Sequence, residues 1–180
     1  MLALAAAVVG SKVHLAQTGD CRLYVASERD GGFTPLTQDH EGSNLAERQR
    51  LYSLIIEERF AFFPPFPDPD SSRLWRPRLF RHVASHFVGG LVPTRAFGDW
   101  EYQPAVIHMP ECLTVNLSEF ARGELFALCS DGGNRYVEYT LGQVNGGAWE
   151  LSLAQLAEIT RARIDQPADD VTIIYFRVTH

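Results

Sequence analysis

Residues 124–133 read ELFALCSDGG, a short unbroken apolar run that ends in an aspartate followed by two glycines. A continuous apolar run of this length is typical of a strand that is buried on both faces. We therefore expect a buried strand over 124–130, with Asp131 at its tip. Residues 171–178, VTIIYFRV, form the strongest strand pattern in the chain, and Asp169 and Asp170 come directly before it.

Three further strands are expected near the N-terminus, over 2–9, 13–17 and 22–26. Gly19 and Asp20 break the chain between the second and the third, and the close spacing predicts an antiparallel meander. The run at 2–9 also has the composition of a signal-peptide core, but no Lys or Arg precedes it. We interpret it as a buried strand.

Two amphipathic helices are expected, one in each half of the chain. Asn44 can cap the first, over 45–59, and Glu47 three positions later completes a capping-box pattern. The apolar residues near one face of this helix are Leu45, Tyr52, Ile55 and Ile56. Ser152 with Gln155 opens the second helix, which we expect to run to residue 164.

Proline and phenylalanine are concentrated between residues 60 and 78. Because proline removes backbone donors and breaks helices, a loop or insertion is expected there. We interpret the chain as one domain, residues 1–180, with an insertion rich in Pro, Phe and Arg at 60–82. This insertion also contains a cluster of four arginines, Arg73, Arg76, Arg78 and Arg81. The cluster is either a solvated face or a docking site for an acidic or phosphorylated partner.

The sequence lacks several common catalytic signatures. It contains no G-x-S-x-G elbow, no Walker loop and no G-x-G-x-x-G. His82 and His86 have the spacing of two zinc ligands on one helix face, but Val83 stands where a zinc protease keeps its glutamate. We therefore interpret both as ordinary histidines.

Composition narrows the function classes further. The 180 residues are 46% hydrophobic and 21% charged, with a formal net charge of −6. This balance is typical of a globular domain, excludes a disordered tail and a membrane bundle, and argues against a general nucleic-acid binder. The three cysteines are far apart in the sequence, which favours a reducing, intracellular compartment.

A carboxylate at the end of a predicted strand is the one repeated feature with chemical meaning. Asp20, Asp131 and Asp169 each occupy such a position, and Asp170 lies beside the last of them. Carboxylates gathered from several strand ends can hold a hard cation such as Mg²⁺ or Mn²⁺, and glycine beside the acid allows close approach. The alternative is ordinary turn chemistry, in which Asp beside Gly is common.

Five short motifs in order resemble those of the type-2C metal-dependent Ser/Thr protein phosphatases. They are TGDCR at 18–22, TQDH at 37–40, RAFGD at 95–99, LCSDG at 128–132 and DDVT at 169–172. Further residues most resemble the pyruvate dehydrogenase phosphatase branch: Asp39, His40, Asn44, Glu47, Leu51 and the Leu91-Val92-Pro93 segment.

The resemblance implies an α+β fold: a four-layer αββα sandwich of two antiparallel β-sheets flanked by helices. It implies a centre of two Mg²⁺ or Mn²⁺ ions whose bridging water attacks phosphoserine or phosphothreonine in a protein substrate. Asp131 and Asp169 would ligate one core metal, and Asp20 and Asp131 an additional, weaker one. Asp170 and Gly132 would lie at or next to the ligands. Arg95 and Asp99 belong to a structural motif near the site.

The chain also departs from the family pattern. It lacks the DGHGG motif, which carries the aspartate that bridges the metals. It also lacks the general-acid histidine and the phosphate-binding arginine of the family. Arg135 stands four residues after Asp131, where the family often has an acid, and would repel a metal. We therefore expect an N-terminally incomplete phosphatase domain with weak or no activity alone. The alternative is a pseudophosphatase that binds a phosphoprotein or a regulator.

The resemblance also predicts the partners and the compartment. We expect the chain to bind a phosphorylated protein substrate, and we do not expect it to bind nucleic acid or a membrane. A sandwich without its first strands would leave an open sheet edge, which favours self-association. The branch resemblance suggests the mitochondrial matrix and leaves the cytoplasm and nucleus open.

Overall fold

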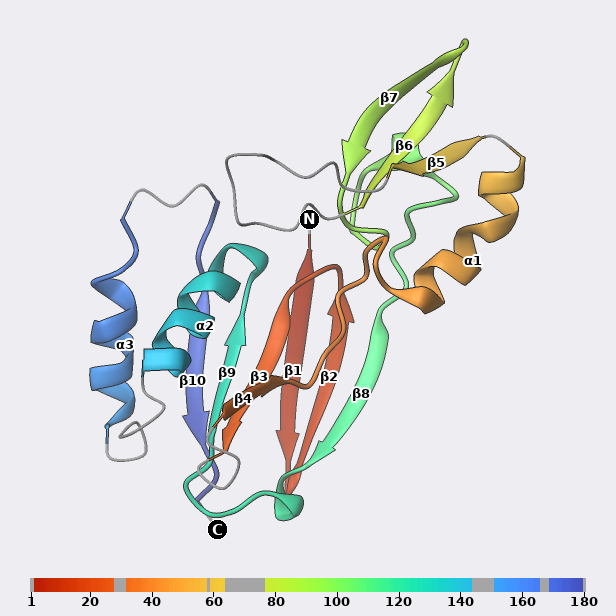
Figure 1. Cartoon of the computed structure of the whole chain (residues 1–180). Helices are drawn as coiled ribbons and strands as arrows, with labels where there is room; N and C mark the ends of the chain where they lie inside the picture. The colour runs from red at the N-terminus through yellow and green to blue at the C-terminus, as the bar shows by residue number, and fades with distance from the viewer. Residues whose placement is uncertain are drawn as a thin grey trace. The chain divides into compact units, whose positions relative to one another are not determined.

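The computed structural model describes residues 2–27, 32–57, 59–63, 77–143, 151–165 and 169–179 (Figure 1). The chain divides into two compact units. The first, which we call the helix–hairpin unit, comprises Met1–Ala3, Thr18–Asp20 and Asp39–Pro110; the second, the sandwich unit, comprises Leu4–Gln17, Cys21–Gln38 and Glu111–His180. Within the described ranges, no helix is long and apolar enough to cross a membrane.

The sandwich unit contains two β-sheets, which we call the β2 sheet and the β9 sheet. The β2 sheet has the order β1-β2-β8, with bounds Ala3–Val9, Lys12–Thr18 and Glu111–Asn116. The β9 sheet has the order β10-β9-β3-β4, with bounds Ile173–Arg177, Leu125–Cys129, Arg22–Ser27 and Gly32–Pro35. Strand β9 pairs antiparallel with both β3 and β10, and β2 pairs antiparallel with β8.

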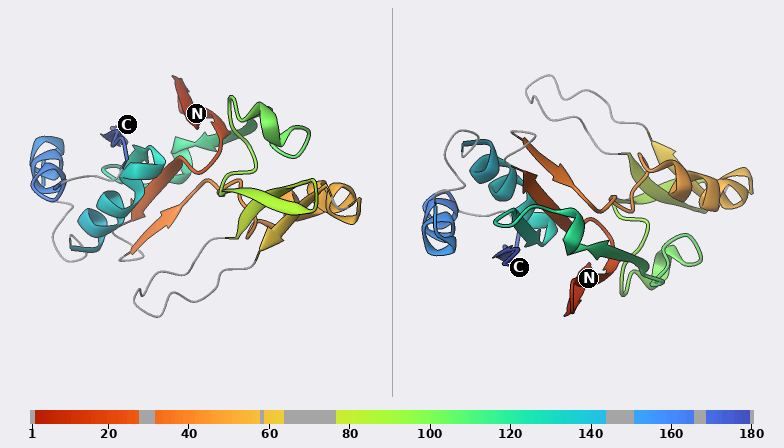
Figure 2. Two further views of the ribbon diagram at one scale, coloured as in Figure 1. Left: turned by 90° about the horizontal axis from the view of Figure 1, so that it is seen from above. Right: turned by 90° about the horizontal axis from the view of Figure 1, so that it is seen from below.

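Two apolar clusters form the core of this unit, one on each side of the β9 sheet. The cluster between the two sheets consists of Val13, Leu15, Leu23, Val25, Val115, Phe126 and Val178. The other lies under helices α2 (Asn134–Gln143) and α3 (Leu153–Arg161) and consists of Tyr24, Ala26, Leu125, Ala127, Cys129, Val137, Leu141 and Leu156. The unit is therefore a helix–sheet–sheet arrangement (Figure 2), which agrees with the α+β class expected from the sequence.

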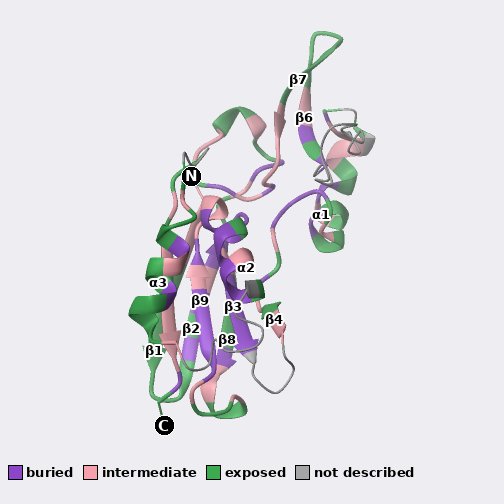
Figure 3. Cartoon of the chain, turned by 60° about the vertical axis from the view of Figure 1, so that its left-hand side comes forward, coloured by how far each residue is buried: buried purple, intermediate pink, exposed green. Residues whose placement is uncertain are grey.

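Strand β9 is buried on both faces, which explains its unbroken apolar sequence. Phe126 packs toward the β2 sheet, while Leu125, Ala127 and Cys129 pack toward the helices. The ring of Phe126 stacks on Phe176 at a centroid distance of 5.1 Å. Because successive side chains point to opposite faces of a strand, both sets must be apolar, and Figure 3 shows β9 as mostly buried.

Two expectations about the N-terminal strands were wrong. Strand β1 forms, but it is an edge strand and residues 5–9 are exposed rather than buried. Strands β1 to β3 do not make a meander, because β3 pairs with β4 and β9 instead of β2. The chain leaves the β2 sheet through Gly19, whose φ of +94° is a conformation that favours glycine.

The helix–hairpin unit contains helix α1 and a three-stranded antiparallel sheet. Helix α1 is Leu45–Ile56, and the sheet has the order β5-β6-β7, with bounds Phe60–Phe63, Arg78–Val83 and His86–Leu91. The apolar core consists of Leu51, Phe60, Leu79, Ala96, Ala105 and Val106. Three short 3₁₀ helices complete the described elements of the chain: Trp100–Tyr102, Leu117–Glu119 and Asp131–Gly133.

The structure corrects two predictions in this unit. Residues Phe60–Phe63 form a strand rather than a loop, because Phe60 lies in the apolar core and Phe62 packs against it. Leu45 and Tyr52 are 68% and 65% exposed, so they are not on the buried face of α1. His82 and His86, which were interpreted as ordinary histidines, lie on the two strands of a hairpin and pair across the ladder with Phe87 and Val83 respectively.

The arginine cluster is described only in part. Arg78 donates to the carbonyl of Gly90 at 2.8 Å, and Arg81 pairs with Glu101 at 2.6 Å. Arg73 and Arg76, like the proline-rich stretch at 64–76, lie outside the described residues. The two described arginines therefore have contacts within their own unit.

The C-terminal predictions were mostly confirmed. The strands expected over 124–130 and 171–178 are β9 and β10. Helix α3 begins with the expected capping box, since Ser152 accepts from the Gln155 amide and Gln155 accepts from that of Ser152. Helix α2 was not predicted, because its first turn contains no acidic residue and two glycines precede it. Of the three cysteines, Cys21 and Cys129 are buried and Cys112 is exposed.

Candidate metal-binding site

Asp131 lies at the junction between strand β9 and helix α2. The strand ends at Cys129, a 3₁₀ turn spans Asp131–Gly133, and the helix begins at Asn134. The Gly133 amide donates to the Ser130 carbonyl at 2.9 Å and closes this turn. The side chain of Asp131 is therefore placed by a buried strand on one side and by a helix on the other.

The segment that carries Asp169 and Asp170 runs beside this junction. The Ser130 amide donates to the Thr172 carbonyl at 3.0 Å, which continues the pairing of β9 with β10. The Ser130 hydroxyl donates to the Asp170 carbonyl at 3.1 Å and accepts from the Thr172 amide at 3.0 Å. Three hydrogen bonds at Ser130 thus hold the two acidic segments together.

Gly132 allows this close approach. A Cβ atom at this position would lie 2.5 Å from the Asp170 carbonyl oxygen and 3.2 Å from the Cβ of Asp169. The first distance is well inside van der Waals contact, so any other residue would push the Asp169–Asp170 segment away. The structure therefore brings Asp131, Gly132, Asp169 and Asp170 to one edge of the sandwich unit.

The carboxylates at this edge are accessible to solvent. Asp131 is half-buried, whereas Asp169 and Asp170 are exposed. One oxygen of Asp169 accepts from the Asp170 amide at 2.8 Å. Carboxylate oxygens are the ligands that Mg²⁺ and Mn²⁺ prefer, so these side chains have the chemistry of cation ligands.

Arg135, which was expected to repel a metal, contacts an aromatic neighbour. Its guanidinium lies 4.5 Å from the ring centroid of Tyr136 and donates to the Tyr136 hydroxyl. A stacked guanidinium is restrained in position. The charge of Arg135 is therefore held over Tyr136 in this structure.

Asp20 belongs to the helix–hairpin unit, where it is 6% exposed. The adjacent residue Gly19 exchanges two backbone contacts with the buried His40: its amide donates to His40 Nδ1 at 3.1 Å, and its carbonyl accepts from the His40 amide at 3.1 Å. The His40 carbonyl in turn accepts from Thr94 at 2.7 Å. His40 therefore holds the turn that carries Asp20.

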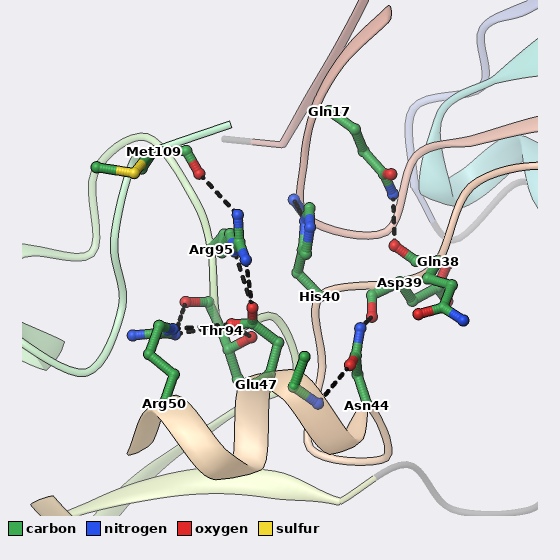
Figure 4. Close-up of polar contacts among 12 residues, drawn as sticks. Gln17, Gln38, Asp39, His40, Asn44, Glu47, Arg50, Thr94, Arg95 and Met109 are labelled. Atoms are coloured by element: carbon green, nitrogen blue, oxygen red, sulfur yellow. Dashed lines mark hydrogen bonds and ion pairs between the residues drawn. The ribbon is translucent and has the colours of Figure 1, made fainter. Parts of the chain in front are cut away.

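Glu47 takes part in an ion-pair network that was not predicted. Asn44 caps α1 as expected, by accepting from the Ala46 amide at 3.0 Å, whereas Glu47 had been expected to complete the capping box. The Glu47 carboxylate is 1% exposed and accepts from Arg95 at 2.6 Å, from Arg50 at 2.8 Å and from Thr94 at 2.7 Å (Figure 4). Burial by itself would raise the pKa of Glu47, but these hydrogen bonds lower it to about 2.

The two RAFGD residues singled out in the sequence have different environments. Arg95 binds Glu47 through two nitrogens and donates to the Met109 carbonyl at 3.2 Å. Asp99 adopts a left-handed backbone with φ +53° before the turn at Trp100–Tyr102. A buried acid with an arginine three residues later on a helix is the signal that could have identified Glu47 as part of an ion-pair network.

Within the residues that the structure describes, no group of three or more His, Cys, Asp and Glu side chains is arranged to hold a metal ion. The acidic edge of the sandwich unit is thus a partial donor set of Asp131 with its neighbours Asp169 and Asp170. Asp20, the third predicted ligand, belongs to the other unit.

Comparison with known proteins gives the family context. The family model described as Protein phosphatase 2C matches residues 1–133. A probable protein phosphatase 2C 11 of Arabidopsis thaliana is 31% identical over 131 residues, which are 72% of this chain and 28% of that protein. The human pyruvate dehydrogenase [acetyl-transferring] phosphatase 2, mitochondrial, is 34% identical over 95 residues, which are 51% of this chain and 15% of that protein.

Solved structures show the same fold at low sequence identity. The serine-threonine phosphatase 2C from Toxoplasma gondii superposes with a TM-score of 0.60 at 18% identity, covering 98% of this chain and 57% of that one. The chain spans only 15% and 28% of the length of the human and Arabidopsis relatives.

Proposed function

Because the chain belongs to the protein phosphatase 2C family, we propose that it acts in the metal-dependent hydrolysis of phosphoserine and phosphothreonine in a protein substrate. The observation that carries this proposal is the packing of Gly132 against the Asp169–Asp170 segment, with a Cβ–oxygen distance of 2.5 Å for any larger residue. It leaves Asp131 and Asp169 on adjacent segments, as a shared cation requires.

In this proposal Asp131 and Asp169 hold one Mg²⁺ or Mn²⁺ ion. Asp170 adds negative charge beside them. A bound divalent ion supplies an acidified water and neutralises charge on the phosphoryl group. The protein's own contribution is to fix the two carboxylates through Ser130 and to keep Gly132 free of a side chain.

Arg95 and Asp99 support the site indirectly in this proposal. Arg95 is committed to Glu47, at 2.6 Å, so we assign it to holding the 94–99 segment rather than to binding phosphate. We further propose that residues 1–180 form part of a phosphatase domain and that 60–82 is an insertion in it.

Cation binding and turnover by the 180-residue chain test the proposal directly. We expect Mn²⁺ binding, measured by electron paramagnetic resonance, to weaken strongly in Asp131→Asn, and any hydrolysis of a phosphothreonine peptide to be lost with it. The control is Asp165→Asn, an exposed aspartate of the same unit, which should bind Mn²⁺ as the parent does.

The outcomes separate two functions. If the Asp131→Asn variant bound Mn²⁺ as tightly as the parent chain, the assignment of the site would be wrong. Binding of the phosphopeptide without turnover, at saturating Mn²⁺, would instead favour the alternative, a phosphoprotein-binding pseudophosphatase.

We also propose self-association through strand β1. This strand has the uncharged sequence ALAAAVV, lies at a sheet edge, and exposes Val8 and Val9 by 64% and 63%. Beside it, an apolar groove of 620 Å³ is lined by residues that include Ala6, Val8, Ile174 and Phe176. An unpaired, uncharged edge favours pairing with another strand.

Light scattering across a range of protein concentrations tests this association. We expect the parent chain to form dimers or larger species, and Val8→Lys to remain monomeric because an edge lysine opposes strand pairing. A monomeric parent chain at the highest concentration would contradict the proposal. For the compartment we propose the mitochondrial matrix, supported by the human mitochondrial relative, and imaging of the tagged natural protein would test it.

A further inference from the structure

A polar cluster inside the sandwich unit joins the first residues of β3 to helix α2. Arg22 donates from Nη1 to the Tyr24 hydroxyl at 2.7 Å and to Glu138 Oε1 at 2.8 Å. The Tyr24 hydroxyl donates to the same Glu138 oxygen at 2.7 Å. We call Arg22, Tyr24 and Glu138 the α2 clamp.

The charge states of the clamp are fixed by its surroundings. Tyr24 is 1% exposed; burial raises the pKa of its hydroxyl, and the hydrogen bond to Glu138 raises it further. Tyr24 is therefore a neutral donor, and the positive charge of Arg22 balances the Glu138 carboxylate. The three side chains thus satisfy one another's hydrogen-bonding groups.

A second contact holds the first residue of the same helix. The Cys129 side chain is buried in the β9 sheet beside the start of the helix. Its sulfur lies 3.1 Å from Asn134 Oδ1, which accepts the hydrogen bond. Asn134 is the N-terminal residue of α2 and is buried. The helix is thus fastened to the β9 sheet at its first residue and again one turn later.

The distance along the chain makes this fastening relevant to Asp131. Only residues 130–133 separate the end of β9 from the start of α2. With so few residues between two fixed ends, a small movement of α2 moves the turn that carries Asp131. Conversely, a fastened helix leaves the Asp131 carboxylate few positions to occupy.

We propose that Arg22, Tyr24 and Glu138 are positioning residues, which hold α2 so that Asp131 stays beside Asp169 in a geometry suited to a divalent cation. The role of Asp131 as a metal ligand in this inference rests on the proposed function. The effect of the clamp on the geometry of the turn does not depend on it. None of the three touches the carboxylates; they act through the helix.

Glu138→Ala, with Glu158→Ala as the matched control, tests the clamp. Glu138 has a side chain that is 42% exposed, so its removal is compatible with folding, and Glu158 is an exposed glutamate on α3. We expect the Gly133 amide, which closes the Asp131 turn, to exchange with deuterium faster in Glu138→Ala than in Glu158→Ala. The Mn²⁺ dissociation constant should rise about tenfold, as for partners that orient metal ligands.

Two further measurements separate positioning from general destabilisation. The urea midpoints of the two variants should agree, and Glu138→Gln, which keeps an oxygen that accepts from Arg22 and Tyr24, should recover much of the Mn²⁺ affinity. Equal Gly133 exchange in Glu138→Ala and Glu158→Ala would overturn the inference. The inference would also be overturned if Glu138→Ala lost as much free energy of unfolding as free energy of Mn²⁺ binding.

The same set of variants distinguishes this inference from the proposed function. If Asp131→Asn leaves Mn²⁺ binding unchanged, the metal role of Asp131 fails. The Gly133 exchange rates still decide whether the clamp holds the turn, because that measurement uses no metal.

Discussion

Replacing Glu47 with glutamine should remove most of the stability contributed by the buried ion pairs of the helix–hairpin unit. The carboxylate is 1% exposed and is bound by Arg95 and Arg50 at 2.6 and 2.8 Å. One pKa unit corresponds to about 1.4 kcal/mol. Lowering the pKa from 4.5 to about 2 therefore contributes about 3 kcal/mol at neutral pH. Removing one partner of a buried ion pair costs a similar amount, about 3 to 5 kcal/mol.

The sign of the pH dependence follows from the direction of the shift. The folded-state pKa of Glu47 lies below its unfolded value, so the contribution is fully present above pH 4.5 and is lost as the pH falls toward 2. The variant cannot ionise at this position. The difference in free energy of unfolding between parent and Glu47→Gln should therefore be about 3 kcal/mol at pH 7 and shrink toward zero near pH 2.

Urea titrations followed by far-ultraviolet circular dichroism at several pH values provide the measurement. The matched control is Glu57→Gln just after the same helix, because Glu57 is 58% exposed and lies 3.9 Å from Arg59. This control should change the free energy of unfolding by less than about 0.5 kcal/mol. A Glu47→Gln effect below about 1 kcal/mol, or one that is independent of pH, would refute the assignment of Glu47 as a charged, paired group.

Three further substitutions give distinct outcomes. Gly132→Ala should weaken Mn²⁺ binding in titrations, because the added Cβ meets the Asp170 carbonyl at 2.5 Å; unchanged affinity would contradict the proposed site. Gly89→Ala should lower the melting temperature, because φ is +101° and the Cβ would lie 2.7 Å from Tyr102 Cζ, whereas Gly142→Ala, which meets no atom within 4 Å, should not. Phe126→Ala should cost about 3 to 5 kcal/mol in urea unfolding, since it empties the space between the two sheets; a loss below about 1 kcal/mol would mean that the sheets repack around it.

The sequence predicted the elements that carry a strong local signal. Strand β9 was evident because both of its faces are apolar, β10 because of its long apolar and aromatic run, and α3 because Ser152 and Gln155 cap it locally. Strand β1 has the same apolar composition as β9 but is exposed, since composition reports what a strand could bury and not which strand becomes its neighbour. The change of sheet at Gly19 likewise depends on pairing partners far along the chain.

The aspartates of the candidate site could be named from the sequence, but the buried residues and the helix that hold their surroundings could not. Asp131 and Asp169 could be named because each stands at the end of a strand, and the structure confirms that their segments run side by side. Glu47 and His40 are buried polar residues. The spacing of Glu47 and Arg50 on α1 was a local signal, but the contacts of Glu47 with Arg95 and of His40 with Gly19 join distant segments, so only the folded chain reveals them. Helix α2 was missed because its anchors, at Tyr24 and Cys129, come from the sheet and not from its own sequence.

The uneven burial of the cysteines has a practical consequence. Cys112 lies exposed on strand β8, whereas Cys21 and Cys129 are within the core. A nitroxide reagent should therefore attach at one place in the native protein, without mutagenesis. Paramagnetic coupling between that reporter and an added manganese ion would then locate the ion by triangulation with a second, engineered tag.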